Sequence, residues 1–336
     1  MKIIKQTLVL VLGTLSLFSS CMLNAQCCST GSPVGASVYV GVLGRNYLRV
    51  IGYYRHSFSD TYYEGDHVAK NQDPVYNSSF NFSGVTLGYG ITKRLTVEIE
   101  AGYYFDKTQN KFKYNSEGNK IDYQLQGSGM SNGTLTVKYG DYINPAKQVE
   151  ITSGLGFRFP FSLTPQYFNG VILDRDVQPS TNAFGVSGIL FLSKGFQSIS
   201  MRVFSINRYD YNFADNLNYK YGNILLNSVF VSKKIFTYFF GTLQLRNEWK
   251  TNDRDLNNLD VRNGKITDTG FDLVTVAPQL SYSIAGKWNL MAVFDIPVYK
   301  YYNGRQMTPS YSVAVSLTRD FNLARKLPVI QPANIN

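Results

Sequence analysis

The sequence predicts an all-β fold: a transmembrane, antiparallel, up-and-down β-barrel of about 12 strands, with short periplasmic turns and long extracellular loops. Three observations predict it. Long segments alternate apolar and polar side chains with the period of two that a β-strand imposes. They supply the roughly nine to eleven residues that a tilted strand needs to cross a bilayer. The connections between them alternate between short and long along the chain, as in bacterial outer-membrane barrels.

The hairpin at residues 85–105 carries the clearest alternation. Its first arm, 85–91, has apolar side chains at every second position, and Thr92-Lys93-Arg94 is a short polar turn. The second arm has an apolar row, Leu95, Val97, Ile99, Ala101, Tyr103 and Phe105, and a more polar row, Thr96, Glu98, Glu100, Gly102 and Tyr104. A face toward lipid and a face toward a polar lumen explain both rows. The alternative is a soluble β-sandwich or barrel with one wet face.

The composition agrees with a barrel. The 336 residues include 25 Tyr and 22 Phe, and only 17% are charged. The mean hydropathy of −0.16 argues against a helical membrane protein, but half of each barrel strand is polar, so a barrel remains compatible. The formal net charge is +10, yet no nucleic-acid recognition motif accompanies it, and nucleic acid is a poor partner for an exported chain.

The first 25 residues read as a signal peptide. Lys2 and Lys5 form a basic start, and the apolar stretch that follows is too short to span a bilayer. We expect cleavage between Ala25 and Gln26; lipoprotein processing at Cys21 is the alternative. Cys27 and Cys28 would then be neighbours near the new N-terminus, and too few further ligands lie nearby for a four-ligand metal site.

The rest of the chain divides into three parts. Residues 26–45 form a periplasmic lead-in or a lumen plug, 46–321 the barrel, and 322–336 a periplasmic tail. Strands are expected at 46–58, 85–91, 95–105, 133–140, 148–161, 182–192, 197–208, 219–232, 236–249, 271–284, 288–300 and 311–321. Long polar loops are expected at 59–76, 107–128, 162–181, 209–218 and 250–269.

Three short motifs carry a family resemblance. They are Cys27-Cys28-Ser29, Asp176-Val177-Gln178-Pro179-Ser180-Thr181, and Ile296-Pro297-Val298-Tyr299 followed by Asn303-Gly304-Arg305-Gln306. With them, the chain resembles a family of Bacteroidetes outer-membrane β-barrel transporters, which is similar to the family named for the MetA pathway of phenol degradation. The resemblance implies a barrel and the uptake of small organic solutes. It implies no catalytic residue and no phenol chemistry.

The strand phases place a set of charged side chains on the inward face. They are Arg49, Arg55, Glu98, Glu100, Lys138, Glu150, Arg158, Arg202, Arg246, Glu248 and Asp295. These residues would line a water-filled path and tune its selectivity. The alternative is that they pair across neighbouring strands and fill a narrow lumen.

Three functions are compatible with these features. A passive channel or transporter for small solutes is the main hypothesis, and a structural or surface-interaction barrel without an open pore is the second. A lipid-modifying enzyme is a distant third, because no nucleophile motif surrounds His56 or His67. We expect no catalytic, cofactor or metal site. The expected partners are outer-membrane lipids and lipopolysaccharide: basic turns would contact phospholipid headgroups, and acidic loops would hold divalent cations.

Overall fold

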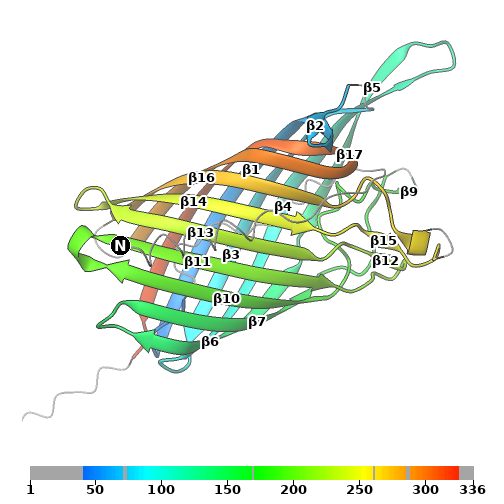
Figure 1. Ribbon diagram of the computed structural model, residues 1–336. Coiled ribbons are helices and arrows are strands. Elements are labelled where there is room, and N and C mark those ends of the chain that lie inside the picture. The colour runs from blue at the N-terminus through cyan, green and yellow to red at the C-terminus, as the bar shows by residue number, and fades with distance from the viewer. Residues whose placement is uncertain (1–40, 71–73, 169, 260–261, 285–287, 325–336) are drawn as a thin grey trace, which may run out of the picture.

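The computed structural model describes residues 41–70, 74–168, 170–259, 262–284 and 288–324. They form a closed barrel of tilted antiparallel strands (Figure 1), which confirms the predicted fold class. In these ranges no helix has the length and apolar character needed to cross a membrane. The Ala25–Gln26 cleavage position, the cysteines and most of the predicted C-terminal tail lie outside the described residues.

The barrel wall is built from the main sheet. That sheet has thirteen strands, of which β2 and β5 are bonded outside the ring, so eleven elements close the wall. They are β1 (Tyr47–Gly65), β3 (Val75–Gly90), β4 (Leu95–Tyr114), β6 (Gly133–Asn144), β7 (Val149–Phe159), β10 (Gly185–Phe196), β11 (Met201–Asn212), β13 (Ile224–Lys234), β14 (Phe239–Lys250), β16 (Phe271–Ile284) and β17 (Trp288–Asn322). The connections hold β2 (His67–Val68), β5 (Lys120–Met130), β8 (Tyr167–Phe168), β9 (Val171–Ile172), β12 (Tyr219–Lys220), β15 (Arg254–Asp255) and two single-turn 3₁₀ helices, η1 (Gln197–Ile199) and η2 (Arg262–Gly264).

The last element, β17, crosses the wall twice. Its residues 288–302 pair with β16, and its residues 302–322 pair with β1. Every neighbouring pair in the ring is antiparallel, and strand directions can alternate around a closed ring only if the number of crossings is even. The chain therefore reverses within β17, where Gly304 has φ +74°, a conformation that glycine adopts readily. The wall thus has the expected twelve crossings.

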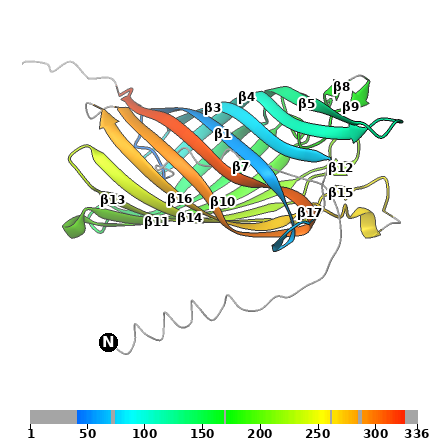
Figure 2. The same cartoon turned by 90° about the horizontal axis from the view of Figure 1, so that it is seen from above.

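Short and long connections lie at opposite ends of the barrel (Figure 2). The described short connections are 91–94, 145–148, 197–200 and 235–238. Both ends of the wall lie at this side too, because Tyr47 is the register partner of Asn322 and the Asn46 amide donates to the Gly90 carbonyl oxygen at 2.8 Å. One predicted turn was misplaced: Ser193-Lys194-Gly195 belongs to β10, and the chain turns at 197–200 instead.

The segment 107–128 was predicted to be a loop, but most of it is β-strand. Strand β4 continues to Tyr114, and β5 pairs with it from Tyr103–Met130 to Tyr114–Lys120, forming the arm that projects beyond the wall in Figure 1. Strands β1 and β3 likewise extend into the predicted loop at 59–76. Beyond the bilayer both faces of a hairpin meet water, so the alternation that marks a membrane strand is absent there.

Inside the wall the two faces differ as predicted, and β14 shows this clearly. Thr242, Gln244, Arg246 and Glu248 are buried in the interior, whereas Leu243 and Leu245 are more than half exposed on the outside. A water-soluble barrel would reverse this arrangement, with apolar side chains inside. The outer face is therefore a surface for lipid.

Exposed aromatic side chains ring both edges of the apolar band. At the short-turn end they include Tyr47, Tyr89, Tyr139, Tyr142, Phe196, Phe236, Tyr238 and Tyr282; at the long-loop end they include Tyr54, Tyr103, Phe105, Phe157, Phe184, Tyr209, Trp249, Tyr299 and Tyr301. Aromatic rings prefer the membrane–water interface, so two such girdles mark the boundaries of the bilayer.

The lipid-facing phase can be tested at Leu87, which lies opposite Ile99 in the β3–β4 register and is 42% exposed. Leu87→Arg should destabilise the barrel by about 2–4 kcal/mol, because a guanidinium near mid-membrane loses its hydration. Unfolding by urea in lipid vesicles, followed by heat-modifiable gel mobility, would measure this. Leu87→Val is the control and should stay close to wild type; equal loss in both variants would contradict the assignment.

Candidate functional site

None of the eleven predicted inward-facing charged residues is exposed, and most of them meet an opposite charge. The central group joins three strands. Arg55 of β1 contacts Asp295 of β17 at 2.6 Å, and Arg246 of β14 contacts the same carboxylate oxygen at 3.3 Å. Ser312 also donates to that oxygen, at 2.8 Å. One carboxylate thus holds two guanidinium groups that come from different sides of the closure between β17 and β1.

A second group lies on β4 and β6. Lys138 contacts Glu98 at 2.6 Å, and Glu100 accepts a hydrogen bond from the Tyr53 hydroxyl at 2.7 Å. Pairing across neighbouring strands, which was one of the two alternatives for these charges, is therefore present here.

A third group lies toward the short-turn end. Arg202 is 3.7 Å from Glu150 and donates to the Ser193 hydroxyl at 2.9 Å. At the rim of the same end, Arg49 and Asp320 form two hydrogen bonds of 2.7 Å each.

Arg158 and Glu248 do not belong to these three groups of paired charges. Both are largely buried, and Arg158 Nε and Glu248 Oε1 have no hydrogen-bond partner among the described residues. A buried polar atom without a protein partner is usually satisfied by water. The interior is thus polar and only partly neutralised by its own ion pairs.

The strand phases missed several interior charges. Arg208 and Asp210, 2.8 Å apart, share the parity of Arg202 on β11. Arg208 is the last residue of the predicted strand 197–208 and was overlooked, whereas Asp210 lies two residues beyond its predicted end. Lys250 and Asp253, also 2.8 Å apart, are buried at the end of β14, where the sequence predicted a loop. Lys107 is buried on the part of β4 that was assigned to a loop.

The second half of the predicted loop 162–181 folds into the mouth of the barrel. Val177 and Gln178 are only 1% and 3% exposed, and the Lys107 ammonium donates to the Gln178 carbonyl oxygen at 2.8 Å. We call residues 173–183 the inner loop. Its backbone runs so close to β5 that a Cβ at Gly127 would overlap the carbonyl oxygen of Val177. The motif that begins at Asp176 therefore lies inside the barrel mouth rather than outside it.

Ion pairs and hydrogen bonds fasten the inner loop to the wall and to neighbouring connections. Arg175 pairs with Asp215, and Ser180 donates to the Asn132 side chain at 2.7 Å. Burial lowers the pKa of Arg175, but Tyr221 and Asp215 together outweigh burial and raise the pKa above its usual value. Arg175 thus stays cationic at the mouth.

A cavity of about 140 Å³ remains between the inner loop and the wall. Its lining includes five cationic side chains, Lys107, Arg158, Arg175, Arg208 and Lys250, and two carboxylates, Glu100 and Asp210. At the level of the inner loop, the space left inside the barrel is therefore narrow, and most of the charged side chains that line it are positive.

The short-turn end is also partly covered. Residues 41–44 enter the barrel, where the Val42 amide donates to Glu150 at 2.9 Å and the Leu43 amide donates to Thr96 at 2.8 Å. Leu43 is 4% exposed. These described residues belong to the segment predicted as a lead-in or plug; the rest of that segment lies outside the described residues.

The arrangement around His56 does not form a nucleophile–base pair. His56 Nδ1 contacts the side chain of Asn81 at 2.9 Å, while the neighbouring Ser57 and Ser59 are buried on the opposite face of β1. In the described ranges, no group of three or more His, Cys, Asp or Glu residues is arranged to hold a metal ion.

Comparison with known proteins supports the fold. No protein-family model and no curated protein matches the chain. Among solved structures, the COG4313 outer membrane channel from Pseudomonas putida F1 superposes with a TM-score of 0.63 at 15% identity, covering 84% of this chain and 97% of that one. The NanC porin (TM-score 0.44, 15% identity, 81% and 98% covered) and the KdgM porin (0.41, 10%, 81% and 99%) are more distant. The chain thus has the fold of an outer-membrane channel, and the narrower family resemblance stays a prediction.

The central ion group yields a stability prediction. Asp295→Asn should lower the free energy of unfolding by about 3–5 kcal/mol, because it leaves Arg55 and Arg246 without their shared carboxylate. Asp320→Asn is the matched control: it removes another Asp–Arg pair between β17 and β1, but that carboxylate is 38% exposed, so the loss should stay below about 1 kcal/mol. Equal losses in vesicle unfolding would contradict a role for burial.

Proposed function

We propose that the protein is a passive channel of the bacterial outer membrane that admits small organic solutes and prefers anions. The observation that carries the proposal is the narrow cavity beneath the inner loop, whose lining holds five cations against two carboxylates. In a confined space with low-dielectric walls, such an excess concentrates small anions and repels cations.

Arg158 is one source of this preference. Arg175, Arg208 and Lys250 each have a carboxylate partner, in Asp215, Asp210 and Asp253, so much of their charge is neutralised locally. The guanidinium of Arg158, in contrast, makes no ion pair within the described residues, and it lines the cavity. Its positive charge is therefore available to a passing anion.

A hydrated path is supported by buried polar atoms along the interior. Arg246 Nε, Glu248 Oε1, Gln279 Oε1 and Asp295 Oδ1 have no hydrogen-bond partner in the described part of the chain, and water would satisfy them. The eleven predicted lumen charges would line this path, with their ion pairs fixing side chains against the wall and leaving a narrow passage.

A structural barrel without an open pore is the second candidate. The small cavity favours it, as do the two coverings of the lumen, the inner loop at one end and residues 41–44 at the other. A lipid-modifying enzyme is less well supported, since Ser57 and Ser59 face away from His56. Conductance in a planar bilayer separates the channel from the sealed barrel.

Displacing the inner loop should enlarge the conductance. Gly127→Val would place side-chain atoms where the Val177 carbonyl lies, so the loop must move away from β5. We expect a severalfold larger single-channel conductance. Gly188→Val on β10 is the matched control, because a Cβ there meets nothing within 4 Å. No current from either variant or wild type would favour the sealed barrel.

Replacing the cavity cation should change ion selectivity. Arg158→Gln is expected to shift the reversal potential in a KCl gradient toward cation permeability, because it removes one of the positive charges that line the cavity. Lys113→Gln, which removes an exposed charge from the projecting β4–β5 hairpin, should leave the reversal potential unchanged. An unchanged selectivity in Arg158→Gln would refute the assigned role.

A further inference from the structure

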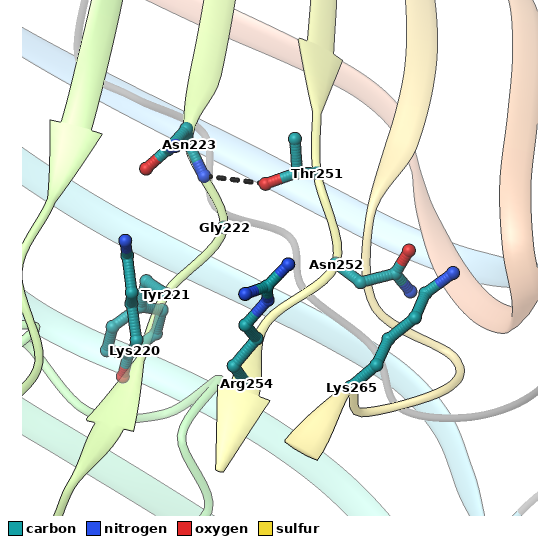
Figure 3. Close-up of a pocket in the computed structure, with 8 residues that line it drawn as sticks. All are labelled: Lys220, Tyr221, Gly222, Asn223, Thr251, Asn252, Arg254 and Lys265. Carbon is teal, nitrogen blue, oxygen red and sulfur yellow. Dashed lines mark hydrogen bonds between the residues drawn. The ribbon is translucent and has the colours of Figure 1, made fainter. Parts of the chain in front are cut away.

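Strands β12 and β15 lie side by side at the long-loop rim of the barrel (Figure 1). A second, basic hollow is lined by residues of these two strands and of the segments next to them (Figure 3). Its volume is about 380 Å³. The lining has three cationic side chains, Lys220, Arg254 and Lys265, and no carboxylate. Asn223 and Thr251 add polar groups that can still donate a hydrogen bond, whereas the Asn252 amide already donates to the carbonyl oxygens of Ile266 and Thr269.

The hollow reaches the outer face of the wall at Lys220, although Tyr221 and Gly222 line both this hollow and the cavity beneath the inner loop. The Lys220 ammonium donates to the Tyr211 hydroxyl at 3.0 Å and lies 4.1 Å from the centre of that ring. Tyr211 is on the outward row of β11, between the exposed Tyr209 and Phe213. The adjacent Tyr219 points the other way and donates to the buried Asp253.

The three cations are neighbours across strands. Lys220 is the register partner of Arg254, and Arg254 forms an antiparallel bridge with Lys265. Side chains directly opposite each other lie on one face about 5 Å apart at Cβ, so three like charges in a row repel one another. Within the described residues none of the three makes an ion pair. An anion between them would convert this repulsion into attraction.

The position of the hollow selects the kind of anion. The Asn223 side chain donates to the hydroxyl of Tyr209 at 3.1 Å, and Thr251, the first residue after β14, follows the exposed Trp249 by two positions. These rings belong to the aromatic girdle, so the hollow lies at headgroup level. Three apolar side chains are exposed closer to the middle of the neighbouring strands, Val229 on β13 and Leu243 and Leu245 on β14. They would face the acyl chains of the lipid.

We propose that Lys220, Arg254 and Lys265 bind a phosphate group of a phosphorylated glycolipid in the outer leaflet, of the lipid A type. The cations would hold the phosphate, the Asn223 and Thr251 side chains would contact its sugar, and the apolar strip on β13 and β14 would contact the acyl chains. Free phosphate offers the same charge but cannot use that strip. The proposal rests on the outer-membrane location and is independent of conduction.

The test measures lipid binding to the detergent-purified full chain through the midpoint of thermal unfolding. The probes are bisphosphorylated lipid A, dephosphorylated lipid A with the same acyl chains, and inorganic phosphate. The test variant is K220Q/R254Q/K265Q. The matched control, K70Q/K113Q/K120Q, removes the same number of positive charges from exposed positions elsewhere at this end.

Bisphosphorylated lipid A should raise the midpoint of wild type and control equally, while the test variant should bind it about a hundredfold more weakly. Dephosphorylated lipid A should give a much smaller shift with wild type. The proposal is overturned if the test and control variants respond alike, or if phosphorylation of the lipid makes no difference. A full shift with inorganic phosphate alone would also overturn it, in favour of a free-anion site.

Discussion

The requirement that every backbone polar group be satisfied in lipid determines this structure. A strand edge left open in hydrocarbon costs several kcal/mol for each unpaired group, so the sheet must close. Closure is made by β1 and the second half of β17, whose register runs from Tyr47–Asn322 to Gly65–Tyr302. Because all neighbours are antiparallel, closure also demands an even number of crossings, and the reversal within β17 supplies the twelfth.

Closure in turn sets the interior. A polar row must face inward at every second position, and closure brings inward side chains from the two ends of the chain within reach of one another. Arg55 and Asp295 are 240 residues apart in sequence yet form one ion pair. The interior also holds apolar clusters, such as Phe204 stacked on Phe230 with ring centres 4.4 Å apart, so part of the lumen is filled by side chains rather than by water.

The sequence was sufficient wherever lipid imposes alternation and insufficient wherever it does not. The strand at 271–284 has the same first and last residues in the structure as in the prediction. None of the eleven charged residues that were placed on the inward face is exposed. The projecting part of the β4–β5 arm was missed because water meets both of its faces, so its sequence does not alternate between apolar and polar residues. The inner loop was missed for another reason: its burial depends on contacts such as Lys107 with Gln178, which join segments 71 residues apart. Local patterns report which face a residue occupies, but not which distant residue it meets.

The alternation that builds the wall also keeps the two proposed functions on separate faces. At the rim, Tyr219 and Asp253 face the lumen, while their sequence neighbours Lys220 and Arg254 face the outside. The inward pair helps to fix the mouth near Arg175, whose guanidinium lies 4.3 Å from the centre of the Tyr219 ring. The outward pair forms the basic hollow. A single strand pair thus carries the two surfaces for which we propose solute selection and lipid binding. Charges on opposite faces of the pair are separated by the sheet, so each surface can change by substitution without rebuilding the other.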